Sequence, residues 1–258
     1  MKRLFVVGTG PGDPKFLTEE ARKAIAQSEF VAGFPLYLDL IRDLLEGKET
    51  FTAPMGKELE RCRAALEAAQ AGKTAALVCS GDAGIYGLAG LALELAPEYG
   101  GVEVELIPGL TAALSCAALL GSPLTNDFAV VSLSDLLTPW DLIEKRLSGA
   151  AAAGFVLCLY NPGSRGRKGH LERACGIVLR HRDARSVCGV VRNAGREGQS
   201  LLVTTLGELR SITADMFTTI FIGNEATKNI GGKMVTSRGY AWAGHCTPPV
   251  NRRVKNEG

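Results

Sequence analysis

The sequence has no closely spaced cysteine pairs, no long apolar runs and little excess charge. Its seven cysteines never form a C-x-x-C pair, and several lie in apolar runs where a thiol behaves as a small hydrophobic side chain. We therefore expect free thiols and a reducing, cytoplasmic compartment. No stretch approaches the roughly 20 apolar residues of a membrane span, and the short apolar run near the N-terminus ends in glycines instead of a signal-peptide cleavage site. These features predict a soluble protein without a membrane partner.

Charge and histidine spacing remove further classes of function. The chain has 29 lysines and arginines against 27 acids, so its net charge of +2 does not favour a nucleic-acid partner. The three histidines show no metal-ligand spacing with one another or with a cysteine, so no protein-bound metal is expected. A segment AGKT looks like the end of a phosphate loop, but Glu67 stands where such a loop needs glycine.

Short apolar runs alternate with amphipathic stretches, which predicts an α/β fold with a largely parallel first sheet. In the first half we expect strands over 4–7, 30–32, 74–79 and 102–107, and helices over 18–27, 36–45, 57–71, 85–95 and 111–120. In the second half we expect strands over 127–133, 155–160, 187–192, 201–204 and 218–222, and helices over 139–152, 169–181 and 206–212. Turn formers around 121–126 suggest two α/β domains, 1–121 and 122–240, followed by a tail over 241–258. A hairpin around 193–198 would make the second sheet mixed.

The glycine-rich segment GTGPGD follows the first expected strand. Gly8 and Gly10 fit a dinucleotide fingerprint, but Asp13 occupies the place of its third glycine. The segment is then either a tight turn between strand and helix or a backbone that approaches a bulky ligand closely.

A second glycine loop, CSGDAGIYG, lies at the carboxyl end of the strand expected over 74–79, where open α/β sheets bind ligands. The carboxylate of Asp82 would repel a phosphate, so a ligand with positive charge, amine donors or hydroxyls suits this loop better. S-adenosylmethionine has all three. The following segment IPGLTAALSCAALLG starts a helix of small residues, which could admit a flat adenine or could simply pack on the sheet.

Three motifs in this order, GTGPGD, SGD-x-x-I-Y-G and IPG-x-T-A, resemble those of the tetrapyrrole methyltransferases. The resemblance extends from Leu4 to about Tyr240. Four further blocks, AVVSLSDLLTPW, LYNPGSRGR, VVRNAGREGQS and GNEATKNIGGKMVTSRGY, are similar to the branch that methylates C17 of precorrin-3B in cobalamin biosynthesis. The resemblance implies two α/β domains with the active site between them, a homodimer, S-adenosylmethionine as cofactor and S-adenosylhomocysteine as product.

The resemblance also implies which residues line the cofactor site: Pro11, Ser80, Gly81, Asp82, Ile85, Thr111, Ala112, Asn161 and Ala194. Methyl transfer from a sulfonium mainly requires positioning, whereas the accompanying ring contraction also moves protons. Asp13, Ser134 and Asp135 are the candidates for that proton transfer, although Asp135 could equally cap a turn or helix.

A tetrapyrrole is flat and fringed with carboxylates, and the sequence between Tyr160 and Ser200 has nine lysines and arginines against three acids. Five of the basic residues fall in expected loops and are candidates for carboxylate recognition: Arg165, Arg167, Lys168, Arg192 and Arg196. Arg173, Arg180, Arg182 and Arg185 fit a solvated helix face and helix end better. Any cobalt would belong to the substrate.

Several alternatives remain open from the sequence. A related methyltransferase acting on another tetrapyrrole carbon, on RNA or on protein would share the cofactor loops but should lack the SLSDLLTPW and LYNPGSRGR blocks. A nucleotide-binding module without methyl transfer is not excluded by glycines. A nucleotide-dependent oxidoreductase is disfavoured by Asp13.

Overall fold

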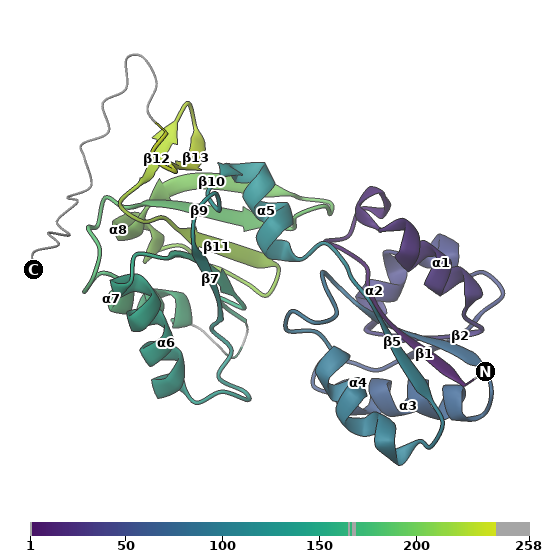
Figure 1. Ribbon diagram of the computed structural model, residues 1–258. Helices are drawn as coiled ribbons and strands as arrows, with labels where there is room; N and C mark the ends of the chain where they lie inside the picture. Colours follow the sequence, from purple (N-terminus) through teal and green to yellow (C-terminus); the bar gives the residue numbers. More distant parts are fainter. Residues whose placement is uncertain (1, 165, 167–168, 241–258) are drawn as a thin grey trace, which may run out of the picture. The chain divides into compact units, whose positions relative to one another are not determined.

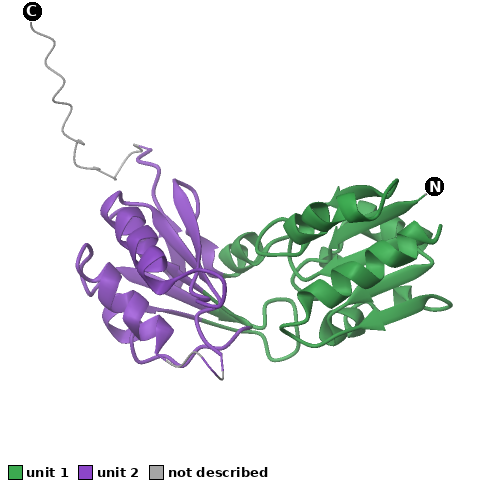
Figure 2. Ribbon diagram, turned by 90° about the horizontal axis from the view of Figure 1, so that it is seen from below, with its two compact units in different colours: residues 1–119, 191–201, 217–219 green, residues 120–190, 202–216, 220–258 purple. Residues whose placement is uncertain are grey.

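A computed structural model describes residues 2–164, 166 and 169–240. The chain divides into two compact units, which Figure 2 colours separately. Unit 1 comprises residues 1–119, 191–201 and 217–219, and unit 2 comprises 120–190, 202–216 and 220–258. The domain ranges expected from the sequence stay a prediction, and the tail expected over 241–258 lies outside the described residues. Among the described helices, none is both long enough and apolar enough to cross a bilayer.

Unit 1 is built on a five-stranded parallel sheet of order β3-β2-β4-β1-β5 (Figure 1). Its strands are β1 (Arg3–Gly8), β2 (Phe30–Gly33), β3 (Glu49–Thr52), β4 (Thr74–Cys79) and β5 (Glu103–Ile107). All four pairings are parallel, which confirms the largely parallel sheet predicted for the first half. Since every strand runs the same way, the loops after β1, β4 and β5 leave from one edge of the sheet.

Two helical layers cover this sheet because its central strands β1, β2 and β4 are apolar and buried on both faces. Helices α1 (Glu19–Gln27) and α2 (Pro35–Asp39) pack with Phe5 and Val7 on one face. Helices α3 (Glu58–Gln70) and α4 (Ala89–Leu95) pack with Leu4 and Val6 on the other. Thr18 caps α1 as expected, because its Oγ1 accepts the Ala21 N–H at 3.1 Å.

Three expectations for the first half need correction. Strand β3 was not predicted, since it is an edge strand with largely exposed side chains and little apolar pattern. The helix expected over 36–45 is α2 followed by a short 3₁₀ turn, Arg42–Leu44. The helix expected from Ile85 begins only at Ala89, because residues 80–88 curl into a loop that the Ala89 N–H closes onto the Ala83 carbonyl.

Unit 2 contains most of a second five-stranded sheet, of order β10-β9-β11-β8-β7. The strands are β7 (Phe128–Ser132), β8 (Val156–Tyr160), β9 (Val187–Arg192), β10 (Ser200–Thr205) and β11 (Thr218–Ile222). Strand β8 pairs with β7 in parallel and with β11 in antiparallel fashion, which confirms the predicted mixed sheet. Helices α6 (Trp140–Ala152), α7 (His170–Val178) and α8 (Leu206–Leu209) share one hydrophobic core with it.

A small third sheet lies within unit 2 and was not predicted. It joins β6 (Gly121–Ser122), β12 (Thr227–Ile230) and β13 (Lys233–Thr236) in the order β12-β13-β6. Gly231 and Gly232, with φ of +57° and +79°, form the two-residue turn between β12 and β13. Its strands are too short for the sequence pattern to separate them from a polar loop.

Candidate functional site

Three loops of unit 1 converge at the carboxyl ends of β1, β4 and β5. Their backbones touch at three glycines, and this contact leaves no room for side chains. A Cβ on Gly109 would lie 2.1 Å from the Gly81 carbonyl oxygen, and one on Gly8 would lie 2.7 Å from the Gly109 nitrogen. Because the colliding atoms belong to the backbone, this arrangement requires glycine at positions 8 and 109, whereas at position 81 the φ of +70° favours glycine.

Hydrogen bonds hold the first two loops in register. Gly10 donates its N–H to the Gly81 carbonyl at 3.0 Å, and Gly81 donates in return to the Gly10 carbonyl at 2.7 Å. Thr9 donates both its N–H, at 2.8 Å, and its hydroxyl, at 3.0 Å, to the Cys79 carbonyl. The two glycine motifs, which lie 70 residues apart in the sequence, are therefore hydrogen-bonded to each other and form one site.

The Asp82 carboxylate ties the second loop to the third. Its Oδ1 accepts the Gly84 N–H at 2.8 Å, and its Oδ2 accepts the Gly109 N–H at 2.9 Å. Each carboxylate oxygen still has acceptor capacity for a ligand. Asp82 therefore organises the loops, a role that sequence reasoning missed, and can also offer negative charge to a ligand.

Around Asp82 lie other residues proposed from the resemblance. Ile85 is apolar yet 43% exposed, in the same loop. Thr111 and Ala112 stand at the start of α5 (Ala112–Leu120), and a Cβ on Gly81 would lie 3.7 Å from the Thr111 Cα. An acceptor carboxylate beside an exposed aliphatic side chain suits a ligand that has both cationic and flat apolar parts.

The loop between β9 and β10 also belongs to unit 1 and reaches the same glycines. A Cβ on Gly195 would lie 3.2 Å from the Pro11 Cγ and 3.3 Å from the Asp13 nitrogen. Ala194 lies in this loop, and Arg192 is an exposed residue at the end of β9. Arg196 reaches farther: its Nε donates to the Pro11 carbonyl at 2.7 Å and its Nη2 to the Ser80 Oγ at 2.8 Å.

Asp13, a candidate for proton transfer, caps the short 3₁₀ turn Pro14–Phe16. Its Oδ1 accepts the Lys15 N–H at 3.0 Å, and its Oδ2 lies 2.7 Å from the Lys15 ammonium. These contacts with Lys15 lower the pKa of the Asp13 carboxyl below its ordinary value. A lowered pKa makes the carboxylate a weaker general base.

Unit 2 gathers a second set of sequence candidates at the carboxyl ends of β7 and β8. The Asn161 side chain donates to the Ser132 Oγ at 2.9 Å, and this oxygen also accepts the Ser134 N–H at 3.2 Å. Asp135 follows on an exposed stretch, and its Oδ2 lies 3.1 Å from the Nε2 of His170, the first residue of α7. Sequence reasoning treated His170 only as a possible metal ligand and missed this pair.

Unusual backbone conformations occur at or beside three of the candidate cofactor residues. Tyr86, Asn161 and Asn193 are the non-glycine residues with positive φ in the described chain, at +54°, +54° and +52°. Each is a predicted cofactor residue or the immediate neighbour of one. Such conformations are unfavourable, most of all for a bulky tyrosine, and they concentrate at binding sites.

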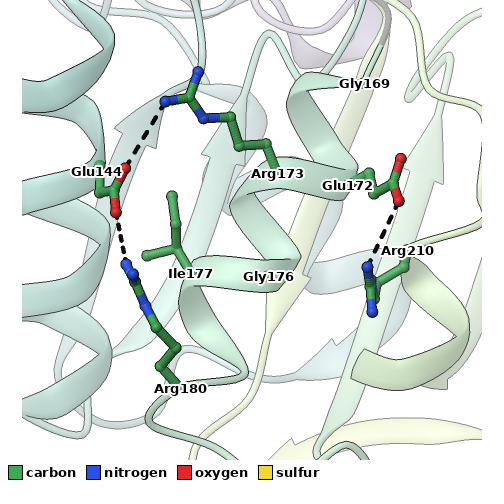
Figure 3. Close-up of a pocket in the computed structure, with 8 residues that line it drawn as sticks. All are labelled: Glu144, Gly169, Glu172, Arg173, Gly176, Ile177, Arg180 and Arg210. Atoms are coloured by element: carbon green, nitrogen blue, oxygen red, sulfur yellow. Dashed lines mark hydrogen bonds and ion pairs between the residues drawn. The ribbon is translucent and has the colours of Figure 1, made fainter.

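The arginines assigned to a solvated helix face have protein partners. An open depression of about 410 Å³ lies on unit 2. Figure 3 shows Glu144 of α6 between Arg173 and Arg180 at this depression. The Glu144 carboxylate lies 2.7 Å from Arg180 and 3.9 Å from Arg173. Arg182 donates to the Gly223 carbonyl at 2.6 Å, and Arg185 pairs with Asp183 at 3.0 Å. Three candidates for carboxylate recognition lie outside the described residues: Arg165, Arg167 and Lys168.

Residues 3–210 match the model of the Tetrapyrrole (Corrin/Porphyrin) Methylases. The chain belongs to this family. A relative from Salmonella typhimurium, described as a probable cobalt-factor III C(17)-methyltransferase, is 48% identical over 238 residues, which cover 92% of this chain and 99% of the relative. Among solved structures, that of the methyltransferase CobJ is similar with a TM-score of 0.83 and 34% identity, covering 91% of this chain and 99% of the other.

A structure of uroporphyrin-III C-methyl transferase from Thermus thermophilus, in complex with S-adenosylhomocysteine, shares the fold. Its TM-score is 0.65 and its identity 24%, and the alignment covers 86% of this chain and 92% of that one. The tetrapyrrole methylase fold, expected from the motifs, is thus confirmed, and family members use S-adenosylmethionine.

Proposed function

We propose that this protein transfers a methyl group from S-adenosylmethionine to C17 of a cobalt-containing tetrapyrrole, at the cobalt-factor III or precorrin-3B stage of cobalamin biosynthesis, with ring contraction. The observation that carries the proposal is the 48% identity to the Salmonella relative over nearly the full length of both chains. The name of that relative favours the cobalt form of the substrate over the metal-free form.

The geometry of unit 1 fits the cofactor. Its loops present the Asp82 carboxylate, which suits the ammonium, sulfonium and ribose groups of S-adenosylmethionine. The guanidinium that reaches these loops, that of Arg196, is bonded to Pro11 and Ser80. When bound, the cofactor supplies an activated methyl group and leaves as S-adenosylhomocysteine. The residues that would hold it are those named from the resemblance; the Asp82 carboxylate would suit its cationic and hydroxyl groups, and the exposed Ile85 side chain would suit its apolar parts.

The remaining roles are assigned by chemistry. Methyl transfer needs the acceptor carbon and the methyl group to be in line, so this chain contributes mainly orientation and exclusion of water. Asp135 is the better candidate for moving a proton during ring contraction, because its carboxylate has His170 as partner while Asp13 is held by Lys15. Of the five basic residues named as candidates for binding substrate carboxylates, Arg192 and Arg196 are described. We propose Arg192 for this role, because the guanidinium of Arg196 is bonded to Pro11 and Ser80.

The decisive experiment is an anaerobic incubation with S-adenosylmethionine and either cobalt-factor III or the metal-free precorrin. We expect the cobalt form to gain one methyl by mass, with release of one equivalent of S-adenosylhomocysteine. Turnover of the metal-free form alone would overturn the choice of substrate. A ¹³C-methyl label and NMR then identify the methylated carbon.

Two alternatives would give different results. Methylation at a carbon other than C17 would identify a related enzyme of the same family. Binding of S-adenosylhomocysteine without transfer to either substrate would indicate a binding module. We also propose a cytoplasmic homodimer, which sedimentation equilibrium of the purified chain and fractionation of the producing cells would test.

A further inference from the structure

Arg196 is one of the basic residues that the sequence offers for substrate recognition, but its surroundings in unit 1 point to another role. Its side chain is half-buried, and its Nη1 is covered and has no hydrogen-bond partner among the described residues. The guanidinium carbon lies 5.3 Å from the centre of the Phe217 ring and 5.9 Å from that of Tyr37. A half-buried guanidinium that is flanked by two aromatic rings, with one of its nitrogens covered, is poorly placed to meet a large macrocycle from solvent.

The stem of Arg196 lies against the first glycine loop. A Cβ on Gly12 would come within 2.7 Å of the Arg196 Cγ and 3.0 Å of its Nε. The glycine at position 12 therefore leaves the space through which this side chain passes. Burial lowers the pKa of Arg196 below its ordinary value, but the group stays charged at neutral pH because an arginine pKa starts so high.

The head of Arg196 fixes both cofactor loops at once. Its Nε bond holds the Pro11 carbonyl in the loop after β1, and its Nη2 bond holds the Ser80 hydroxyl in the loop after β4. The Ser80 hydroxyl in turn donates to the Gly10 carbonyl at 3.4 Å. These partners are 185 and 116 residues away in sequence from Arg196, so the tie depends on the tertiary structure.

We infer that Arg196 is a positioning residue, which shapes the cofactor loops by bonding Pro11 and Ser80 and does not bind the substrate. The inference rests on the proposed function, because it takes these loops to be the cofactor site. It predicts that loss of the guanidinium changes cofactor affinity and leaves the affinity for the tetrapyrrole unchanged.

The test compares Arg196→Ala, Arg196→Lys and a matched variant, Arg63→Ala, in the full chain. Arg63 is a half-exposed arginine of unit 1 whose partner, Glu98, lies 4.0 Å away on the surface. By calorimetry, Arg196→Ala should bind S-adenosylhomocysteine about 10- to 100-fold more weakly than the unmodified protein, because hydrogen bonds to a charged group are lost. The affinity of Arg196→Lys should lie between those of Arg196→Ala and the unmodified protein, since an ammonium does not reproduce the bidentate geometry of a guanidinium. The affinity of Arg63→Ala should match that of the unmodified protein.

Two further measurements separate positioning from substrate binding. The KM for the tetrapyrrole at saturating S-adenosylmethionine should be unchanged in Arg196→Ala, and methylguanidinium should restore part of the lost affinity for S-adenosylhomocysteine. Gly12→Ala, which displaces the arginine stem, should reproduce the loss. A raised tetrapyrrole KM with unchanged affinity for S-adenosylhomocysteine would overturn the inference and return Arg196 to the substrate site.

Amide hydrogen exchange tests the contact between Arg196 and the two loops without relying on the proposed function. Without any ligand, the backbone amides of residues 9, 10, 12 and 13 and of residues 80–84 should exchange faster in Arg196→Ala than in Arg63→Ala. Unchanged exchange would refute the tie between the loops even if the protein methylates its substrate. Faster exchange in a protein that binds no S-adenosylhomocysteine would instead refute the proposed function and leave the tie intact.

Discussion

Replacing Gly109 by alanine tests whether close contact between backbones shapes the cofactor site. The new Cβ would lie 2.1 Å from the Gly81 carbonyl oxygen and 2.6 Å from the Gly8 carbonyl carbon, where ordinary contact begins at 3.4 Å. Neither neighbour is a flexible side-chain end, so the three loops must separate.

Separation of the loops should weaken two bonds described above. The Gly109 N–H would move relative to the Asp82 Oδ2, now 2.9 Å away, and the Gly10–Gly81 pair would be strained. Overpacking of this kind costs about 1–3 kcal/mol. If it destabilises the loop conformation that binds the ligand by that amount, the affinity for S-adenosylhomocysteine drops about 5- to 150-fold.

The assay is calorimetric titration of S-adenosylhomocysteine into the unmodified protein and the Gly109→Ala variant, with Tm measured on the same samples. Gly149→Ala is the matched control, because Gly149 lies inside α6 and nothing stands within 4 Å of its added Cβ. Undiminished affinity in Gly109→Ala would refute the reasoning, since the loops would then tolerate separation without consequence for the ligand.

Three further predictions follow from single contacts. Asp82→Asn should destabilise the ordered conformation of these loops by about 1.5–3 kcal/mol, because an amide NH₂ then faces a backbone N–H. The measurement is amide exchange at Gly109, which should become faster; unaltered exchange there would contradict the prediction. Gly149→Ala should stabilise the chain by about 0.5–1 kcal/mol, measured by urea unfolding, because alanine favours a helix interior; a lower midpoint would be evidence against open space at that position. Burial raises the pKa of five described thiols, and in a Cys246→Ser background the three of them named below should stay unreactive towards a disulfide reagent at neutral pH until the chain unfolds. Their contribution to stability is complete below the unfolded thiol pKa near 9 and is lost as pH rises through the folded values, so the urea midpoint should fall in alkali; a midpoint that rises there would refute it. These thiols belong to Cys62, with a pKa of about 12, Cys79, about 11, and Cys175, about 12.

Local pattern determined the elements with strong apolar periodicity. Strands β4, β9 and β11 begin and end where the sequence predicts, because buried strands read as continuous apolar runs bounded by glycine or polar residues. The helix expected from Ile85 was wrong over its first turn. Helical spacing continues there, but the Ala89 N–H bonds to the Ala83 carbonyl six residues earlier and closes the segment into a loop instead of a helical turn.

For the site, the sequence by itself determined the family and the composition of the glycine loops. Motif order and residue types depend only on the chain, and Asp82 alone already disfavoured a phosphate ligand. The tertiary structure decided what each residue does. The contacts of Asp82 with Gly109, of Asp135 with His170 and of Arg196 with Ser80 join residues 27 or more positions apart. No local pattern encodes such pairs, because they form only when the sheets bring the ends of distant strands together.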